Sequence, residues 1–428
     1  MQLSAKMVRE RLAHMKPRLT NCSLETSRKG QNAVGELMRA VHHGQVRVKH
    51  HDFENFEGAW VLPDDPRRDG AILYLHGGGY TCGGLEYALG FGAALADECG
   101  AKVFCAAYRL APEFPFPAAV EDAAQAYEYL LKKGYAPEKI SLCGESAGGG
   151  LCFALCLYLR QQGLSLPGSI VAISPWTDLT FSGESFETNK ECDVSLSREQ
   201  LGFYAQCYSD ATENPLVSPL LGDLKKFPPS LIFVGGDEIL RSDSEMLHSK
   251  LLKQGNVSQL SVHPGRWHAY LLYGLNEDRE DWVTMNAFLS KYLSRERKLR
   301  WMRLDNAAKI YPAALRQSWS NVFRLSVTLT EEIDVAVLQS ALDVTVRRFP
   351  SMCVRLRRGL FWYYFQQRER APAVREENSY PVTRMSRREI RTCAFRVIAY
   401  EKRIAVEVFY EVTDGNGGMV FLKSLTAE

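Results

Sequence analysis

The sequence has little net charge and no long apolar run. Its formal net charge is +2 over 428 residues, which leaves no overall field that would favour nucleic acid or an anionic membrane surface. No stretch approaches the roughly 20 apolar residues of a membrane-spanning helix, and residues 1–19 are too charged for a secretory signal. We therefore expect no nucleic-acid partner and no membrane span, and small molecules are the favoured ligands.

Paired cysteine spacing is also lacking. The eleven cysteines are odd in number and scattered along the chain, without the close pairs typical of metal sites. Several lie inside apolar runs, where a thiol acts as a small buried hydrophobe. This usage predicts no metal site and no disulfide framework, and it favours a reducing, cytoplasmic location.

The composition and its change along the chain predict two soluble domains. Apolar residues make up 46% and charged residues 24%, which is ordinary for globular proteins, and the length exceeds what one core usually organises. Up to residue 300 there are 15 Lys, whereas the rest of the chain has only 3 beside 17 Arg. A charged run at 294–300 has the composition of a connector. We expect domains at 1–296 and 297–428.

Strand-length apolar runs alternate with helical patterns in the first domain, which is the signature of a mostly parallel sheet. The predicted strands are 56–63, 71–76, 102–108, 139–144, 169–175, 230–236 and 258–264. The predicted helices are 86–98, 118–133, 147–161, 198–208, 243–254 and 282–293. Residues 1–45 have helical spacing and form either a cap or helices that pack on the sheet edge.

A serine at a strand-to-helix junction is the candidate nucleophile. Gly144-Glu145-Ser146-Ala147-Gly148 follows the apolar run ISLC and opens a helical pattern. A serine in such a sharp turn needs small neighbours two residues before and two after it, because the chain segments pass close together. The context predicts that Ser146 is an exposed, activated hydroxyl.

A glycine cluster provides candidate donors for a developing oxyanion. Gly77-Gly78-Gly79 follows the strand that ends at His76, and glycines can present backbone N–H groups that side chains would otherwise crowd. We expect the oxyanion hole to use Gly78, Gly79 and Ala147, with a share for Gly77. A tight turn without catalytic role is the alternative.

Where a serine lies in such a strand-to-helix turn, the other two residues of its catalytic triad follow it in the chain in the order acid, then histidine. Candidates for both are therefore sought after Ser146. His268, in the loop after the last strand, is the predicted general base, and His263 is the alternative, because His248 lies within a helical pattern. Asp237, the first acidic residue after the strand 230–236, is predicted to orient the imidazole. Glu238 and Asp243 are fallbacks, and Asp237 could also be a helix N-cap.

These elements resemble the hormone-sensitive-lipase-like family of α/β-hydrolases over about residues 20–295. The residues that carry the resemblance are His76–Tyr80, Tyr108–Glu113, Phe116–Asp122, Gly144–Gly149, Ser174–Leu179, Ser218–Leu220 and Gly236–Asp237. The resemblance implies an α/β-hydrolase fold with N-terminal helices over the acyl pocket, and a carboxylesterase acting on small to medium acyl esters. Such a serine mechanism needs no cofactor. An amidase, a lactonase or a non-catalytic acyl-binding protein are the alternatives.

The second domain shows an α+β pattern. A helix is predicted at 331–348, followed by strands at 353–358, 360–365, 393–400 and 404–410. The stretch Phe409–Gly415 resembles the active-site stretch of the chloramphenicol-acetyltransferase-like superfamily, which includes alcohol acetyltransferases. That family places its catalytic histidine where this chain has Tyr410, and all nine histidines lie at or before His268. We therefore expect a partial acyltransferase-like segment with a structural or interaction role, such as self-association or binding of a protein partner. Residual acyl or CoA binding is the alternative.

Overall fold

The computed structural model describes residues 4–20, 22–42, 45–64, 66–294, 301–303, 322–358, 363–368, 371–378, 380–383, 385–409 and 412–427. The chain divides into two compact units, Met1–Arg295 and Glu296–Glu428. Most of the connector predicted at 294–300 lies outside the described residues. Each unit is described by itself below.

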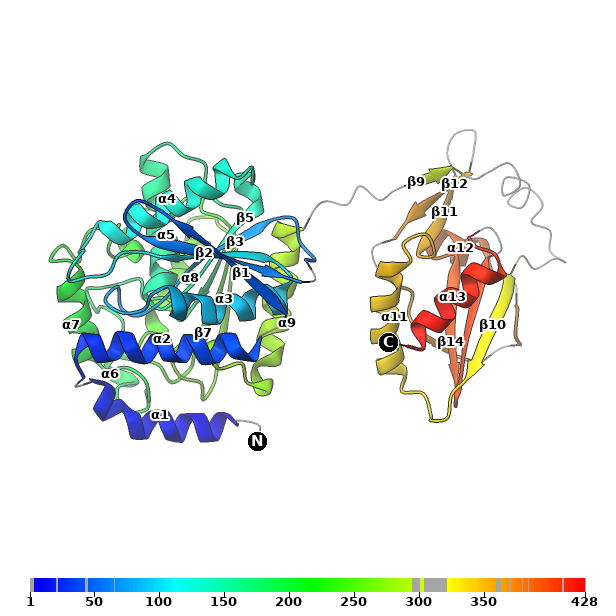
Figure 1. Ribbon diagram of the computed structural model, residues 1–428, viewed down its shortest axis with the longest axis horizontal. Coiled ribbons are helices and arrows are strands. Elements are labelled where there is room, and N and C mark those ends of the chain that lie inside the picture. The colour runs from blue at the N-terminus through cyan, green and yellow to red at the C-terminus, as the bar shows by residue number, and fades with distance from the viewer. Residues whose placement is uncertain are drawn as a thin grey trace. The chain divides into compact units, whose positions relative to one another are not determined.

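The first unit is built on one eight-stranded sheet (Figure 1). Its strands are β1 (Val46–Asp52), β2 (Glu57–Pro63), β3 (Ala71–Leu75), β4 (Lys102–Ala107), β5 (Ile140–Glu145), β6 (Ser169–Ile173), β7 (Ser230–Gly235) and β8 (Ser258–His263). They lie in the order β1-β2-β4-β3-β5-β6-β7-β8. Only the pairs β1–β2 and β2–β4 are antiparallel. The carboxyl ends of β3, β5, β6, β7 and β8 therefore meet at one edge, where ligands bind in sheets of this kind.

Helices cover both faces of this sheet. The helices of the unit are α1 (Ala5–Thr20), α2 (Leu24–Val41), α3 (Leu85–Cys99), α4 (Ala118–Lys132), α5 (Ala147–Gln161), α6 (Ser185–Thr188), α7 (Arg198–Tyr208), α8 (Arg241–Lys253) and α9 (Arg279–Leu293), with short 3-10 turns at Pro137–Lys139, Pro219–Leu221, Tyr270–Tyr273 and Asn276–Asp278. One core cluster joins the sheet to α4, α5 and α8, and a second joins it to α3 and α9.

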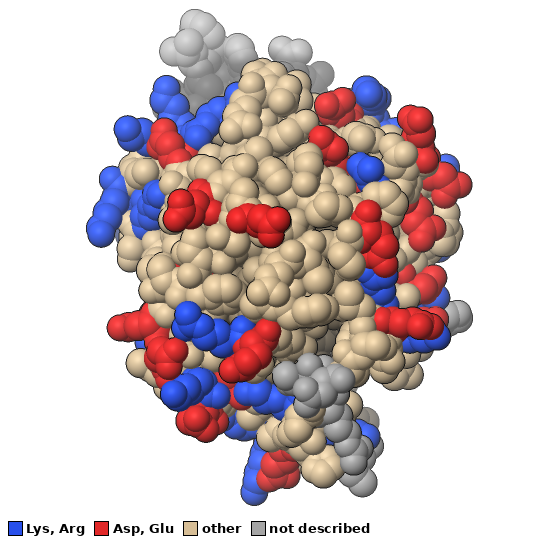
Figure 2. Space-filling view, turned by 90° about the vertical axis from the view of Figure 1, so that its left-hand side faces the viewer, with Lys and Arg blue, Asp and Glu red and all other residues tan. Residues whose placement is uncertain are grey.

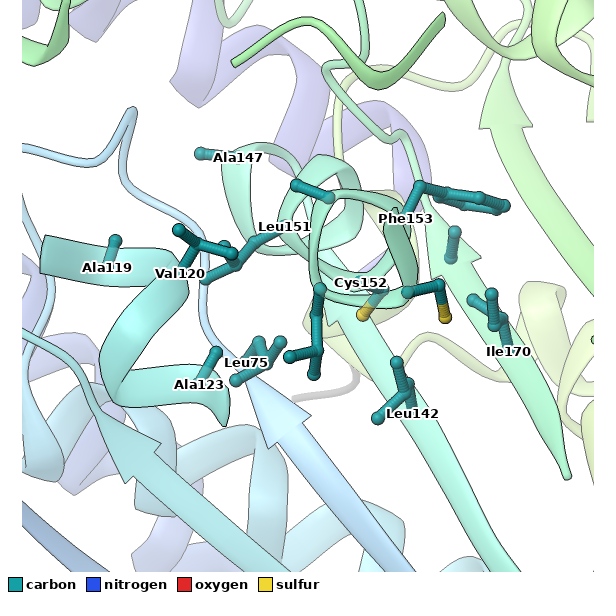
Figure 3. Packing of buried hydrophobic residues seen from close by; sticks show 14 of the residues in the cluster. Leu75, Ala119, Val120, Ala123, Leu142, Ala147, Leu151, Cys152, Phe153 and Ile170 are labelled. Carbon is teal, nitrogen blue, oxygen red and sulfur yellow. The ribbon is translucent and has the colours of Figure 1, made fainter. Parts of the chain in front are cut away.

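The alternation of side chains along the strands explains this sandwich. Leu142 of β5 belongs to the cluster with α5, while the next residue, Cys143, belongs to the opposite cluster. Both are fully buried, because a parallel strand covered on both faces has no solvent side. Figure 3 shows Leu142 and Ile170 of the sheet beside Cys152 and Phe153 of α5. Complete burial of such side chains contributes about 1.5–3 kcal/mol each.

The predicted strands and helices of the first unit are present, with ends shifted by up to three residues. Strand β1 was not predicted. Its side chains are half-exposed or exposed, and the exposed positions include the charged or histidine side chains Arg47, Lys49 and His50. The strand therefore lacks the apolar run that marks the inner strands. An antiparallel edge strand needs only one apolar face.

The N-terminal residues form two helices with different contacts. Helix α2 packs along α3, and the two backbones approach closely at glycines: a Cβ on Gly90 would lie 2.7 Å from the Cα of Gly35. A Cβ on Gly78 would lie 3.0 Å from Oε1 of Gln31, so α2 also reaches the predicted oxyanion loop. The N-terminal segment therefore both packs on the fold and lies beside the glycine loop.

The second unit is an α+β fold with its own core. Its described residues form a four-stranded sheet, a three-stranded sheet and the helices α11, α12 and α13. The first sheet has the order β10-β15-β14-β13, and the second has the order β11-β12-β9. The elements are β9 (Trp301–Arg303), β10 (Val322–Thr328), α11 (Val335–Arg348), β11 (Val354–Arg358), β12 (Tyr363–Gln367), β13 (Arg375–Glu376), α12 (Arg387–Thr392), β14 (Phe395–Tyr400), β15 (Arg403–Phe409) and α13 (Gly415–Leu425). Strands β9, β10 and β13 were not predicted.

A network of buried ion pairs ties the first sheet of this unit together. Arg324 of β10 and Arg396 of β14 both pair with Glu407 of β15, and Arg324 also pairs with Glu377 at 2.6 Å. Some of the many arginines of this unit therefore serve ion pairs inside the unit itself. Tyr410, which stands at the histidine position of the acyltransferase resemblance, lies outside the described residues. Asp414 caps α13 by accepting a hydrogen bond from the N–H of Gly417 at 2.8 Å.

No described helix of either unit combines the length and the apolarity that crossing a bilayer requires.

Candidate active site

Ser146 occupies a strained turn between β5 and α5. Its backbone has φ 54° and ψ −124°, a left-handed conformation that costs a non-glycine residue on the order of 1–3 kcal/mol. The flanking glycines make the turn possible: a Cβ on Gly144 would lie 2.4 Å from the carbonyl oxygen of Gly148, and one on Gly148 would lie 2.1 Å from that of Leu75. The predicted strand–serine–helix turn is therefore present.

The backbone of Ser146 is held by the loop that follows β6. Its N–H donates to the carbonyl of Ile173 at 2.9 Å, and its carbonyl accepts from the N–H of Trp176 at 2.9 Å. Between these two residues lies Ser174, whose own φ is 47°. The loop of Ser146 and the loop after β6 are thus joined by hydrogen bonds at the carboxyl edge of the sheet.

His268 is held by Glu238. Its ring Nδ1 lies 2.6 Å from Oε2 of Glu238, and the Glu238 side chain is fully buried. A carboxylate can only accept, so Nδ1 carries the proton and Nε2 is left as the acceptor. This is the tautomer that a general base requires.

Ser174 joins the acid to the histidine loop. Its hydroxyl donates to Oε1 of Glu238 at 2.6 Å and accepts from the N–H of Ala269 at 2.9 Å. Oε1 also accepts from the N–H of Gly235 at 2.6 Å. In the sequence, Ser174 stands out only as part of the family-like stretch 174–179, since nothing local marks a serine that bridges two distant loops.

The prediction of Asp237 as the residue that orients His268 is not supported by this geometry. Its carboxylate pairs instead with Arg9 of α1 at 2.7 Å, with 27% of the Asp237 side chain exposed. It is not an N-cap either, because α8 begins after Leu240. The side chains of Asp237 and Glu238 point from the same turn towards different partners. Glu238, the fallback predicted from the sequence, is the acid that contacts His268.

Asp243 and His263, the further candidates for the acid and the base, both have structural partners. Asp243 accepts at Oδ2 from the N–H groups of Thr177 and Asp178, at 2.8 and 2.9 Å. His263 lies against Asp281, with 2.9 Å between Nδ1 and Oδ2.

The glycine loop after β3 has the shape that an oxyanion site needs. Gly78 and Gly79 have φ values of 114° and 62°, which disfavour any side chain. A Cβ on Gly77 would lie 3.0 Å from Cβ of Ser146, which places the loop beside the predicted nucleophile. No described residue accepts a hydrogen bond from the N–H of Gly78, Gly79 or Ala147.

Gly77 differs from its neighbours in the loop. Its N–H donates to Oε1 of Glu145 at 2.5 Å and is therefore already used. This geometry does not support the expectation that Gly77 shares in binding an oxyanion. Gly77 instead anchors the loop to the carboxylate next to Ser146.

Glu145 is a buried carboxylate under the glycine loop. It also accepts from the hydroxyl of Tyr74 at 2.6 Å. Burial raises its pKa, and the hydrogen bonds from Tyr74, Gly77 and Tyr87 lower it, so that the pKa settles at about 7 instead of 4.5. An acid whose charge depends on pH in the neutral range thus supports the site.

His268 has a raised pKa. Burial lowers its pKa, but the charge of Glu238 and its hydrogen bond, with smaller contributions from Asp193 and Glu145, raise the pKa above 6.5. The same carboxylate that selects the tautomer therefore also stabilises the imidazolium that proton abstraction would create.

Within the described residues, no group of three or more His, Cys, Asp or Glu side chains could hold a metal ion.

Helix α7 lies beside the glycine loop. The Tyr204 ring lies directly against Gly79, since a Cβ on that glycine would meet the ring at 2.3 Å. Phe203 of the same helix and Phe114 are each 48% exposed. Figure 2 shows the face on the α7 side of Figure 1: uncharged residues cover much of its centre, with acidic side chains among them and most of the other charged side chains towards the margins.

Curated relatives share this part of the chain. Residues 72–272 match a family model described as alpha/beta hydrolase fold. An acetyl-hydrolase of Streptomyces hygroscopicus is 41% identical over 235 residues, which cover 54% of this chain and 78% of the relative. An esterase of Acinetobacter venetianus is 34% identical over 205 residues, covering 47% of this chain and 68% of the relative.

Solved structures are similar to the whole first unit. An esterase/lipase from an uncultured bacterium is 33% identical with a TM-score of 0.62, covering 68% of this chain and 98% of that one. An esterase described as a member of the bacterial hormone-sensitive lipase family is 32% identical with a TM-score of 0.62, covering 69% of this chain and 100% of that one. This chain belongs to the α/β-hydrolase family and, within it, is like the hormone-sensitive lipases.

Proposed function

We propose that the first unit is a serine carboxylesterase in which Ser146 is the nucleophile, His268 the general base and Glu238 the residue that orients it. The single observation that carries the proposal is the 2.6 Å contact between His268 Nδ1 and buried Glu238, in a chain that also holds a serine at φ 54° beside donors in a glycine loop. Backbone strain at a serine and a buried carboxylate that fixes the tautomer of a histidine are features that cluster at active sites, and they favour a catalytic role.

The reaction follows from these roles. Nε2 of His268 takes the Ser146 proton as the oxygen attacks the acyl carbon, and the N–H groups of Gly78, Gly79 and Ala147 stabilise the oxyanion. The imidazolium then gives its proton to the leaving alcohol, which leaves an acyl-enzyme. A water molecule, deprotonated by the same imidazole, releases the carboxylic acid.

Small to medium acyl esters are the proposed substrates. The relatives bear the names acetyl-hydrolase and, in Pseudomonas putida, ethyl acetate hydrolase. The mostly uncharged centre of the face on the α7 side, together with the exposed Phe203 and Phe114, suits an apolar ester. Amides and lactones share the acyl chemistry, so parallel assays on p-nitrophenyl butyrate, the matching anilide and a γ-lactone discriminate between these substrate classes.

Ser146→Ala is the direct test of the mechanism. It should abolish turnover of p-nitrophenyl acetate and butyrate and labelling by a fluorophosphonate probe, while the melting temperature stays close to that of the parent. Wild-type turnover in the variant would exclude Ser146 as the nucleophile. A folded parent protein that the probe does not label would favour an acyl-binding role.

For the second unit we propose a non-catalytic, acyltransferase-like module that serves association. All nine histidines of the chain lie at or before His268, so this unit has no imidazole for transfer to an alcohol. Helices α11 and α13 also expose Val337 and Val420, by 65% and 54%. A chain shortened to end at Arg297 should keep the acyl-length profile of the full chain, and its mass in solution should fall by more than the deleted residues if this unit mediates self-association.

A further inference from the structure

Helix α1 contacts the site loops through one guanidinium group. Arg9 pairs with the carboxylate of Asp237 at 2.7 Å. The same side chain donates to the carbonyl of Gly265 at 3.1 Å and to that of Cys192 at 3.0 Å. One residue near the N-terminus therefore joins three loops that are far apart in the sequence.

Two of these loops carry the proposed catalytic residues. Asp237 immediately precedes Glu238, and Gly265 lies three residues before His268. The two loops are also joined directly, because the N–H of Asp237 donates to the carbonyl of Arg266 at 3.0 Å. Arg9 thus spans a junction whose spacing determines the contact between Glu238 and His268.

The third loop supports the acid loop from the other side. The amide of Asn189 donates to the carbonyls of Gly236 and Glu238, at 3.1 and 2.9 Å. The carboxylate of Asp193 accepts from the N–H of Ile239 at 2.8 Å. Hydrogen bonds from this loop therefore reach the residues on both sides of Asp237.

Helix α1 contacts this supporting loop a second time. Lys16 Nζ donates to the carbonyl of Asp193 at 2.7 Å. At the other end of the helix, Val8 is buried with 7% of its surface exposed. The helix therefore packs against the core through Val8 and, in addition, contacts the loops at the carboxyl edge of the sheet that carry the proposed acid and base.

We propose that Arg9 is a positioning residue for the proposed reaction, and that docked α1 is a structural part of the catalytic apparatus. The proposal rests on the esterase function argued above. Ion pairs with about a third of each side chain exposed, as here at 32% and 27%, contribute little to overall stability. Catalysis is more sensitive, because small displacements of the acid or the base reduce the population of reactive geometries.

A matched control exists in the same N-terminal segment. Arg39 of α2 pairs with Glu86 of α3 at 2.9 Å, and both side chains are 35% exposed. This pair also ties an N-terminal helix to the body of the unit, but neither residue contacts the loops of Glu238 or His268 in the contacts described. Arg39→Ala therefore removes a comparable ion pair without acting on the site.

The test compares Arg9→Ala with Arg39→Ala in the full-length protein, using p-nitrophenyl acetate. We expect Arg9→Ala to lower kcat by about three- to thirtyfold with little change in KM. The acidic limb of kcat/KM should move to lower pH, because a loosened Glu238 raises the pKa of His268 less. Arg39→Ala should keep the kcat and the limb of the parent, with a similar change in melting temperature.

Asp237→Asn provides an independent variant, since it weakens the same contact from the other partner and leaves Arg9 in place. It should lower kcat in the same direction. Parent values of kcat and of the acidic limb in both site variants, or an equal loss of kcat in Arg39→Ala, would overturn the proposal. Failure of the esterase function is distinguishable, because the parent protein itself would then show no turnover of p-nitrophenyl acetate and no labelling by the fluorophosphonate probe.

Discussion

Glu238 and His268 meet at 2.6 Å between Oε2 and Nδ1, while the carboxylate of the preceding residue, Asp237, turns away to Arg9. Two adjacent acids of the same loop therefore have different tasks. One selects the tautomer of the proposed base, and the other fastens the loop to an N-terminal helix.

This division predicts unequal effects of removing the two charges. Glu238→Gln should lower kcat by about a thousandfold or more, because the amide no longer enforces the reactive tautomer. Asp237→Asn should lower it by less than about tenfold. Steady-state kinetics on p-nitrophenyl butyrate measure both values, and a larger loss in Asp237→Asn would return the catalytic role to Asp237.

The raised pKa of His268 predicts a displaced acidic limb. The base acts in its neutral form, so kcat/KM should rise with pH through a midpoint above 6.5. Residual activity of Glu238→Gln should show a midpoint at lower pH, because the charge of Glu238, the largest contribution that raises the pKa of His268, is gone. An unchanged midpoint in that variant would mean that another group produces the limb.

Glu145 predicts a pH-dependent stability of the first unit. Its pKa is about 7 in the folded protein against 4.5 for an unperturbed group, so its proton stabilises the fold below pH 4.5 and this contribution is lost as the pH rises through 7. The loss amounts to roughly 3 kcal/mol between these limits. Urea unfolding from pH 5 to 8 should show a smaller decline for Glu145→Gln than for the parent, and parallel curves would contradict the assignment.

The serine turn predicts intolerance of any side chain at Gly148. A Cβ there would lie 2.1 Å from the carbonyl oxygen of Leu75, and the backbone of β3 cannot retreat inside a packed sheet. Gly148→Ala should lower the free energy of unfolding by about 1–3 kcal/mol or more and impair turnover.

Gly202→Ala in α7 is the matched control, because a Cβ there meets nothing within 4 Å. It should keep or slightly raise stability, as alanine favours a helix. Equal losses in the two variants would show that the close approach at Gly148 is not the cause.

Local patterns determined much of this protein. The run ISLC before Gly144 and the helix pattern after Ser146 sufficed to predict the strained turn, because neighbouring residues alone determine a strand, a tight turn and a helix that follow one another. The glycines after His76 predicted a tight loop in the same way, and its role as a donor of hydrogen bonds to an oxyanion stays a prediction. The limits of most strands and helices in the first unit also followed from apolar periodicity, since both faces of the inner sheet are buried.

Contacts between distant segments were decided only by the tertiary structure. Asp237 and Glu238 have the same chemistry and lie in the same loop, and only the positions of Arg9 and His268 separate their roles. The N–H of Gly77, unlike that of Gly78, is already bonded, because Glu145 lies beneath it. Ser174 can join the loops of Glu238 and His268 because the ends of parallel strands meet at one edge. The spacing of residues in the sequence predicts which side chains share a face of a strand or a helix. The orientation of a loop side chain depends instead on partners that lie tens to hundreds of residues away in the sequence.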